Sequence, residues 1–288
     1  MTGTGALLIN ANDNFTVGIG AKYDEPYGEI IFEHTGRIKV ISSGDKLVGV
    51  GGGYSAAPIT VASGHLEIAG SGISVLGIGS TSGDAFIDIQ DAFVTVKESG
   101  NQAVGIGTVK GKTMISSKGV LNVISDGERS VGIGSMFGND CSIMFEKGKI
   151  SSVVHCDTGS VIGTYSGSGT TVIKDCDITI YGEGSVVTGI GSSMGNWTTE
   201  VTGGILDIKI LSGGGQSFGS DDRLVITGGN VIDRSGNEVV ARNAYGQKLH
   251  KEVKDVDHFE QVIWTEQGEY IYVAERTKEH EVMCIYLP

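Results

Sequence analysis

Short runs of alternating apolar and polar residues follow one another along most of the chain, and glycine-containing turns separate them. The clearest copy, residues 80–107, holds three such runs, whose apolar pairs are Ile87/Ile89, Val94/Val96 and Val104/Ile106. An apolar period of two is typical of strands with one buried face. We therefore predict three short strands in this stretch.

The runs recur with a nearly constant period. A phrase Val-Gly-Ile-Gly, or a close variant, returns every 27 to 31 residues, and its last residues, here called the anchor glycines, are Gly20, Gly51, Gly79, Gly107, Gly134, Gly163, Gly191 and Gly219. A fixed period of this length is typical of a solenoid, in which each repeat buries its apolar face by stacking on its neighbours. The slots 15 and 17 residues after an anchor are apolar in several copies: Leu66/Ile68, Val94/Val96, Ile178/Ile180 and Leu206/Ile208.

Three strands per repeat predict an all-β protein, a right-handed parallel β-helix of about eight coils over residues 1–229. Coils stacked at the sheet spacing of about 4.8 Å would make a rod roughly 40 Å long. The Val, Ile, Thr and Gly content and the lack of a 3.6-residue period disfavour a leucine-rich or helical solenoid.

The glycines of the repeated phrase have two interpretations. If Val104 and Ile106 point inward, Gly105 and Gly107 point outward, and stacked glycines form a flat strip that could accept a sugar ring or a second rod. Alternatively, the glycines occupy corners that need positive φ or close backbone approach. The sequence leaves both interpretations open.

After Gly229 the period stops and the composition becomes charged. Residues 230–288 predict a small antiparallel β-unit that caps the open end of the rod, with a turn at Gln267–Gly268 and Trp264 in its core. Its predicted strands are Gln261–Trp264, Glu269–Val273 and Val282–Leu287.

Composition narrows the classes of partner. The chain has 47 glycines, and 21 Lys and Arg against 34 Asp and Glu give a net charge of -13. An acidic chain repels nucleic acid, so we predict no nucleic-acid partner. No run reaches the roughly 20 apolar residues of a membrane span. The cysteines lack metal-ligand spacing and none is one repeat from another, so we predict buried thiols at Cys141, Cys156, Cys176 and Cys284.

Aromatic residues gather just after the anchor glycines. Stacked along one corner of the rod, they would present apolar ring faces to sugars. The alternative is that they pack across the turns and cover the core. The predicted ligand-binding row is Tyr23, Tyr54, Phe137, Tyr165 and Trp197.

The same corner also collects carboxylates. Oxygen ligands in adjacent turns can hold calcium, so Asp84 and Asp140 are candidate calcium ligands, and no other cofactor is predicted. The alternative is that these side chains bond to backbone groups in their turns.

The sequence offers weaker evidence for a catalytic site than for a binding site. Glycoside hydrolysis needs paired carboxylates, and eliminative cleavage needs calcium with a basic residue. No nucleophile elbow, phosphate loop or dinucleotide motif is present. The mid-strand acids are scattered among ordinary exterior positions: Glu67, Asp88, Asp175, Asp177 and Asp207.

Two stretches carry a resemblance to a known family. The phrase at Val187–Gly191 with the strand at Thr202–Ile208, and the ending Tyr286–Pro288, resemble the Gly-rich repeats of β-helix surface proteins of Gram-positive gut bacteria. The copies at Gly163 and Gly219 depart from the full phrase. The resemblance implies an extracellular or cell-wall-associated rod used for adhesion or carbohydrate contact, and it transfers no catalytic residue.

The leading hypothesis is a non-enzymatic adhesion or carbohydrate-binding module whose partner is a glycan or another ligand on a host or bacterial surface. One alternative is a structural spacer without a ligand. The other is a polysaccharide-degrading β-helix lyase or hydrolase.

Overall fold

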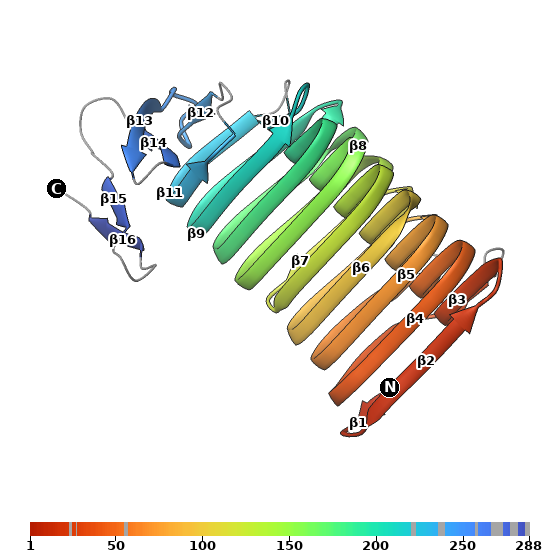
Figure 1. The fold of residues 1–288 in the computed structure, drawn as a ribbon. Coiled ribbons are helices and arrows are strands. Elements are labelled where there is room, and N and C mark those ends of the chain that lie inside the picture. The colour runs from red at the N-terminus through yellow and green to blue at the C-terminus, as the bar shows by residue number, and fades with distance from the viewer. Residues whose placement is uncertain are drawn as a thin grey trace.

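The computed structural model describes residues 1–22, 25–26, 28–54, 57–219, 223–235, 240–256, 259–265, 273–276 and 282–285, with side chains through residue 249. Every helix or strand assigned in these ranges is a β-strand. Strands β1 to β12 join in one parallel sheet that winds into a solenoid, which confirms the predicted parallel β-helix (Figure 1).

The strands are long because they continue through the corners of the coils. β8 alone contains three anchor glycines. The bounds are β1 Thr2–Gly3, β2 Ala6–Asn12, β3 Phe15–Ala21, β4 Ile30–Gly52, β5 Pro58–Ser82, β6 Ala85–Lys110, β7 Thr113–Ser117, β8 Val120–Met194, β9 Trp197–Ser212, β10 Gln216–Phe218, β11 Arg223–Asp233, β12 Ala241–Arg242, β13 His250–Val256, β14 Phe259–Thr265, β15 Val273–Arg276 and β16 Val282–Ile285.

Equivalent positions of successive repeats lie beside one another. Gly79 pairs with Gly107, and Gly107 pairs with Gly134. The predicted apolar slots form ladders inside the rod, such as Ile59, Ile87, Ile115 and Ile143. All four are buried in one continuous core, because aliphatic residues one coil apart stack at the strand spacing.

The structure contradicts the interpretation in which Gly105 and its equivalents point outward. A Cβ on Gly105 would lie 2.4 Å from Cγ1 of the core residue Val123, so this glycine faces inward. Val104 instead belongs to a second apolar cluster outside the main core. Ile106 lies in the main core, as the alternation predicted, and the assignment of Val104 to that core was wrong. The strip of outward glycines does not form, and the alternative of positive φ and close backbone approach holds at Gly107.

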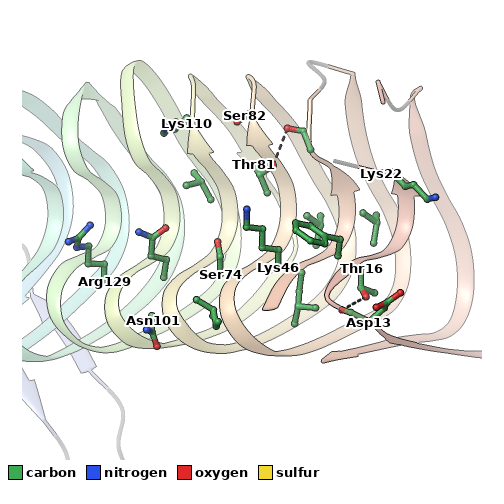
Figure 2. A pocket seen from close by; sticks show the side chains of 18 of the residues that line it. Asp13, Thr16, Lys22, Lys46, Ser74, Thr81, Ser82, Asn101, Lys110 and Arg129 are labelled. Carbon is green, nitrogen blue, oxygen red and sulfur yellow. Dashed lines mark hydrogen bonds between the residues drawn. The ribbon is translucent and has the colours of Figure 1, made fainter. Parts of the chain in front are cut away.

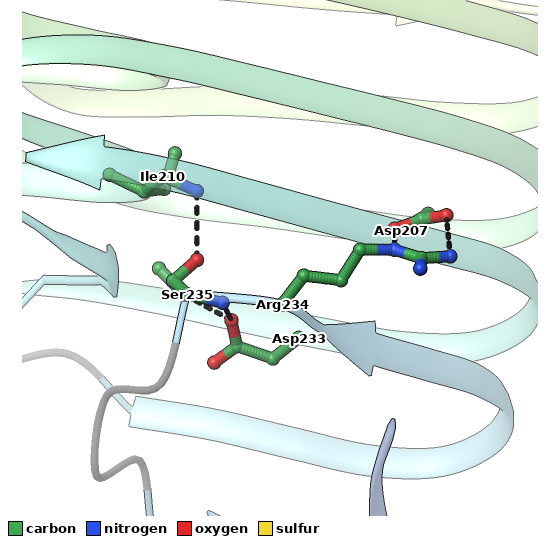
Figure 3. A network of polar contacts seen from close by, with 6 residues as sticks. Asp207, Ile210, Asp233, Arg234 and Ser235 are labelled. Carbon is green, nitrogen blue, oxygen red and sulfur yellow. Dashed lines mark hydrogen bonds and ion pairs between the residues drawn. The ribbon is translucent and has the colours of Figure 1, made fainter. Parts of the chain in front are cut away.

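A polar network closes the last coil after β11 (Figure 3). The buried carboxylate of Asp233 accepts hydrogen bonds from Ser217 Oγ at 2.6 Å and from the Ser235 backbone N–H at 2.9 Å. The Ile210 N–H, at the edge of the sheet, donates to Ser235 Oγ at 2.8 Å. Arg234 makes a two-pronged ion pair with Asp207, at 2.6 and 2.8 Å, which raises the pKa of the guanidinium. The Ser235 side chain thus satisfies the backbone N–H of Ile210, which lies beyond the last paired position of β9 and β11, Ile208 with Asp233.

Two antiparallel pairs follow the solenoid: β13 with β14, and β15 with β16. The predicted boundary at residue 229 lies inside β11, which continues to Asp233. β14 and β16 coincide with two predicted strands, and β14 lies beside β11 (Figure 1). The turn at Gln267–Gly268 and the side chain of Trp264 lie outside the described residues.

Candidate functional site

The anchor glycines turn the chain sharply and in the same way in seven coils. Gly107 has φ of +139°, and a Cβ there would lie 1.7 Å from the carbonyl oxygen of Gly134 in the next coil. L-residues rarely adopt this backbone conformation, so glycine is required by both geometry and space. The seven, with φ between +124° and +139°, are Gly20, Gly51, Gly79, Gly107, Gly134, Gly163 and Gly191.

The corner at these glycines is re-entrant, meaning that the outward faces of the chain before and after it meet. Val104, three residues before Gly107, and Val109, two residues after it, belong to the same cluster outside the main core. The buried members are Val48, Leu76, Val104, Val131 and Met136, with Val17, Val109 and Tyr165 packed against them. This apolar seam runs along the rod at the bottom of the corner.

Above the seam lies an elongated groove of about 890 Å³ (Figure 2). Its first wall, here called the Lys46 rim, is one ladder of paired positions: Phe15, Lys46, Ser74, Gln102 and Arg129. The opposite wall, here called the Lys110 rim, consists of Lys22, Thr81, Ser82 and Lys110. The groove crosses about five coils, a length of roughly 19 Å at the sheet spacing.

The charge of the groove differs from that of the chain. Four cationic side chains line it, Lys22, Lys46, Lys110 and Arg129, against two acidic ones, Asp13 and Glu128. Lys46 Nζ lies 5.2 Å from the centre of the Phe15 ring, a cation–π contact between neighbours on the same rim. Phe15 is itself 63% exposed, so its ring is available to a ligand.

The aromatic row predicted from the sequence is split by the structure. Tyr54 is 65% exposed and stands three residues after Gly51, as Ser82 does after Gly79, so it lies on the line of the Lys110 rim between the coils of Lys22 and Ser82, although it is not one of the residues that line the groove. Phe137 pairs with Lys110 in the next coil and meets Tyr165 edge to face, with ring centres 5.9 Å apart. These two rings therefore lie beyond Lys110 along the same rim. Tyr23 lies outside the described residues.

Trp197 does not belong to this row, because it is only 2% exposed. Its ring lies over Gly169 of the preceding coil, where a Cβ would come within 2.6 Å of it. Its Nε1–H donates to Thr171 Oγ1 at 3.0 Å. A buried indole whose N–H is satisfied is a core residue, so the structure removes Trp197 from the predicted contact row.

The candidate calcium ligands are not brought together. Asp84 and Asp140 stand two coils apart, with Lys112 at the equivalent position between them. Asp84 Oδ1 accepts a hydrogen bond from the Lys112 backbone N–H at 2.8 Å, which matches the alternative of backbone bonding. Among the described residues, no group of three or more His, Cys, Asp or Glu is placed to hold a metal ion.

Two of the mid-strand acids, Glu67 and Asp207, form ion pairs with cationic side chains. Glu67 pairs with Lys39 and with Arg37, and these contacts lower the pKa of its carboxyl. Asp207 holds Arg234 as described above. These ion pairs lie on the outer surface of the rod, and none of their residues lines the groove.

Three cysteines lie buried as free thiols, as predicted: Cys141, Cys156 and Cys176. Burial raises the pKa of Cys156 and of Cys176 to about 12. The side chain of Cys284 lies outside the described residues.

We expect these three thiols to resist alkylation in the folded protein, because the thiolate is the reactive form and almost none exists at about pH 8. Peptide mass spectrometry after iodoacetamide treatment should find them unmodified in buffer and modified in urea. Rapid modification of Cys156 in buffer would contradict the burial of this thiol in the folded protein.

The described part of the chain has no helix of the length and apolarity that a membrane crossing requires. The groove thus combines an apolar seam, hydroxyl and amide side chains, one exposed ring and a local excess of positive charge. Reasoning from the sequence missed Phe15, Lys46 and Arg129, although each stands five residues before an anchor glycine (Gly20, Gly51 and Gly134), at a position that holds no core aliphatic residue. No protein-family model, curated protein or solved structure matches this chain, so its function has to be inferred from this geometry.

Proposed function

We propose that the chain is a non-enzymatic carbohydrate-binding module of an extracellular or cell-wall-associated bacterial protein, with the corner groove as its binding site. The observation that carries this proposal is a groove that repeats the same two walls over about five coils. A site with such a repeat suits a polymer whose units also repeat along its length. The sequence resemblance to surface proteins is in line with this role.

The lining has the chemistry that sugars need. Ser74, Thr81, Ser82, Asn101 and Gln102 offer hydroxyl and amide groups, each able to donate and accept hydrogen bonds. Phe15 and, along the rim, Tyr54 offer exposed ring faces for the C–H faces of pyranose rings. Polar groups that fix orientation beside apolar platforms are typical of ligand sites.

The arrangement of carboxylates favours binding over hydrolysis. The two acids of the groove, Asp13 and Glu128, stand four coil steps apart, roughly 19 Å. Glycoside hydrolysis uses carboxyl groups about 5 to 9.5 Å apart. The groove therefore holds a sugar chain without the acid pair that would cut it by this route.

A glycan array probed with the intact chain tests the proposal. We expect selective binding, reduced about ten-fold or more by the double variant Phe15→Ala/Tyr54→Ala, because each loses a stacking ring worth about 1 kcal/mol. Tyr245→Ala is the matched control, since that ring is 89% exposed and follows β12, outside the coils that form the two rims. A blank array with a folded protein would support the spacer alternative and refute the proposal.

A further inference from the structure

We infer that the groove selects an acidic polysaccharide, one whose sugar units carry carboxylates. This inference rests on the proposed carbohydrate-binding function and specifies its ligand class. It is based on the positions of the cationic side chains in the groove, which cannot be seen from the net charge of the chain.

Positive charge is concentrated in the groove. The chain has 21 cations and 34 acids, and the groove holds four of the former and two of the latter. The groove lining is therefore +2, and the remainder, with 17 cations and 32 acids, is -15. A cleft of one sign on a surface of the other attracts a charged ligand and orients it toward the cleft.

The cations at one end of the groove are available to a ligand. Within the described residues, Lys110 and Arg129 form no ion pair, and both side chains are exposed. Several cations elsewhere are already held by carboxylates: Arg37, Lys39, Lys118, Lys147 and Arg234. A carboxylate reaching Lys110 and Arg129 would not have to displace an internal partner.

The cations are also spaced along the groove. The cations follow one another along the groove in the order Lys22, Lys46, Lys110 and Arg129, and they alternate pairwise between the two rims (Figure 2). Each rim separates its two cations by three coil steps, roughly 14 Å. Between them lie neutral residues such as Ser74 and Ser82. An extended polyuronate carries a carboxylate on each sugar, so it would bring carboxylates to all four cations and place sugar hydroxyls beside the neutral residues between them.

Nucleic acid fits these observations less well. Proteins that bind single-stranded nucleic acid stack successive bases on several aromatic side chains, and Phe15 is the one aromatic residue among those that line the groove.

Calorimetric titration with polygalacturonate, and with the same polymer fully methyl-esterified, tests the inference because esterification removes the charge and keeps the backbone. We expect the acid form to bind about ten-fold more tightly or better, with affinity that falls as salt rises. Lys110→Gln/Arg129→Gln should remove about ten-fold of the affinity for the acid form and little for the ester. Lys97→Gln/Lys209→Gln is the control, with the same charge change on exposed residues outside the groove.

The outcomes separate the inference from the function on which it rests. Equal binding of acid and ester, or binding of neutral glycans alone, would overturn the acidic ligand and leave the carbohydrate function standing. Failure of every glycan to bind would overturn both. A poly(dT) oligonucleotide that binds as tightly as polygalacturonate would overturn the inference in favour of a general polyanion site.

Discussion

Replacing Gly107 with alanine is expected to destabilise the protein by about 3 to 5 kcal/mol. Gly107 has φ of +139°, and the added Cβ would lie 1.7 Å from a backbone oxygen of the next coil. Strained backbone and overpacking both contribute, and neither can be relieved by moving a flexible side chain. Urea unfolding followed by circular dichroism measures the loss.

Gly213→Ala is the matched control for this substitution. Gly213 has no positive φ, and a Cβ added there would have no other atom within 4 Å, so the change should stay within about 0.5 kcal/mol. If Gly107→Ala proved as mild as the control, the re-entrant corner could relax, and the shape of the groove would not depend on the anchor glycines.

Removing the buried carboxyl of Glu98 is expected to change how stability depends on pH. Glu98 is 2% exposed, neither of its carboxyl oxygens has a hydrogen-bond partner among the described residues, and burial raises its pKa well above the usual value. Its side chain occupies space left by Gly70, where an added Cβ would lie 2.2 Å from Glu98 Oε2.

The direction follows from the raised pKa. The unfolded chain releases this proton near pH 4.5, and the folded chain keeps it to a higher pH. The stabilisation is therefore complete below about pH 4.5 and is lost as pH rises toward the folded-state pKa, by up to about 1.4 kcal/mol per pH unit. Glu98→Gln has no such proton, so its stability relative to the wild type should increase steadily from acid to neutral pH.

Urea midpoints of the wild type and Glu98→Gln at several pH values check this difference. Glu33→Gln, on an exposed position of β4, serves as the control and should follow the wild type at every pH. Parallel curves for the wild type and Glu98→Gln would mean that the carboxyl ionises in the fold at an ordinary pH.

The solenoid could be predicted because its signals are local and repeated. Alternation shows which side chains share a face, and a constant period requires equivalent residues to stack, so the ladder through Ile59 and Ile87 follows from spacing alone. The small antiparallel unit was harder to predict, since β13 is rich in charged residues and lacks an apolar alternation of its own.

The candidate site could not be predicted because alternation does not reveal the direction in which a corner bends. With a convex corner, Val104 would belong to the core; the re-entrant corner turns it outward and brings it against Val109. The cationic groove could not be predicted from the net charge for a related reason, because the net charge sums the groove with an acidic exterior. Trp197 was misassigned because its burial depends on Gly169, which lies in the preceding coil.

The re-entrant corner also separates two kinds of constraint on the chain. The angle between the rims is set by backbone at the anchor glycines, whereas each rim residue projects outward and contributes little to the core. Each coil therefore supplies one position per rim that can be exchanged without refolding its neighbours. Apart from rim neighbours that touch, such as Phe15 and Lys46, the ligand preference of the rod can therefore change one coil at a time while its shape stays the same.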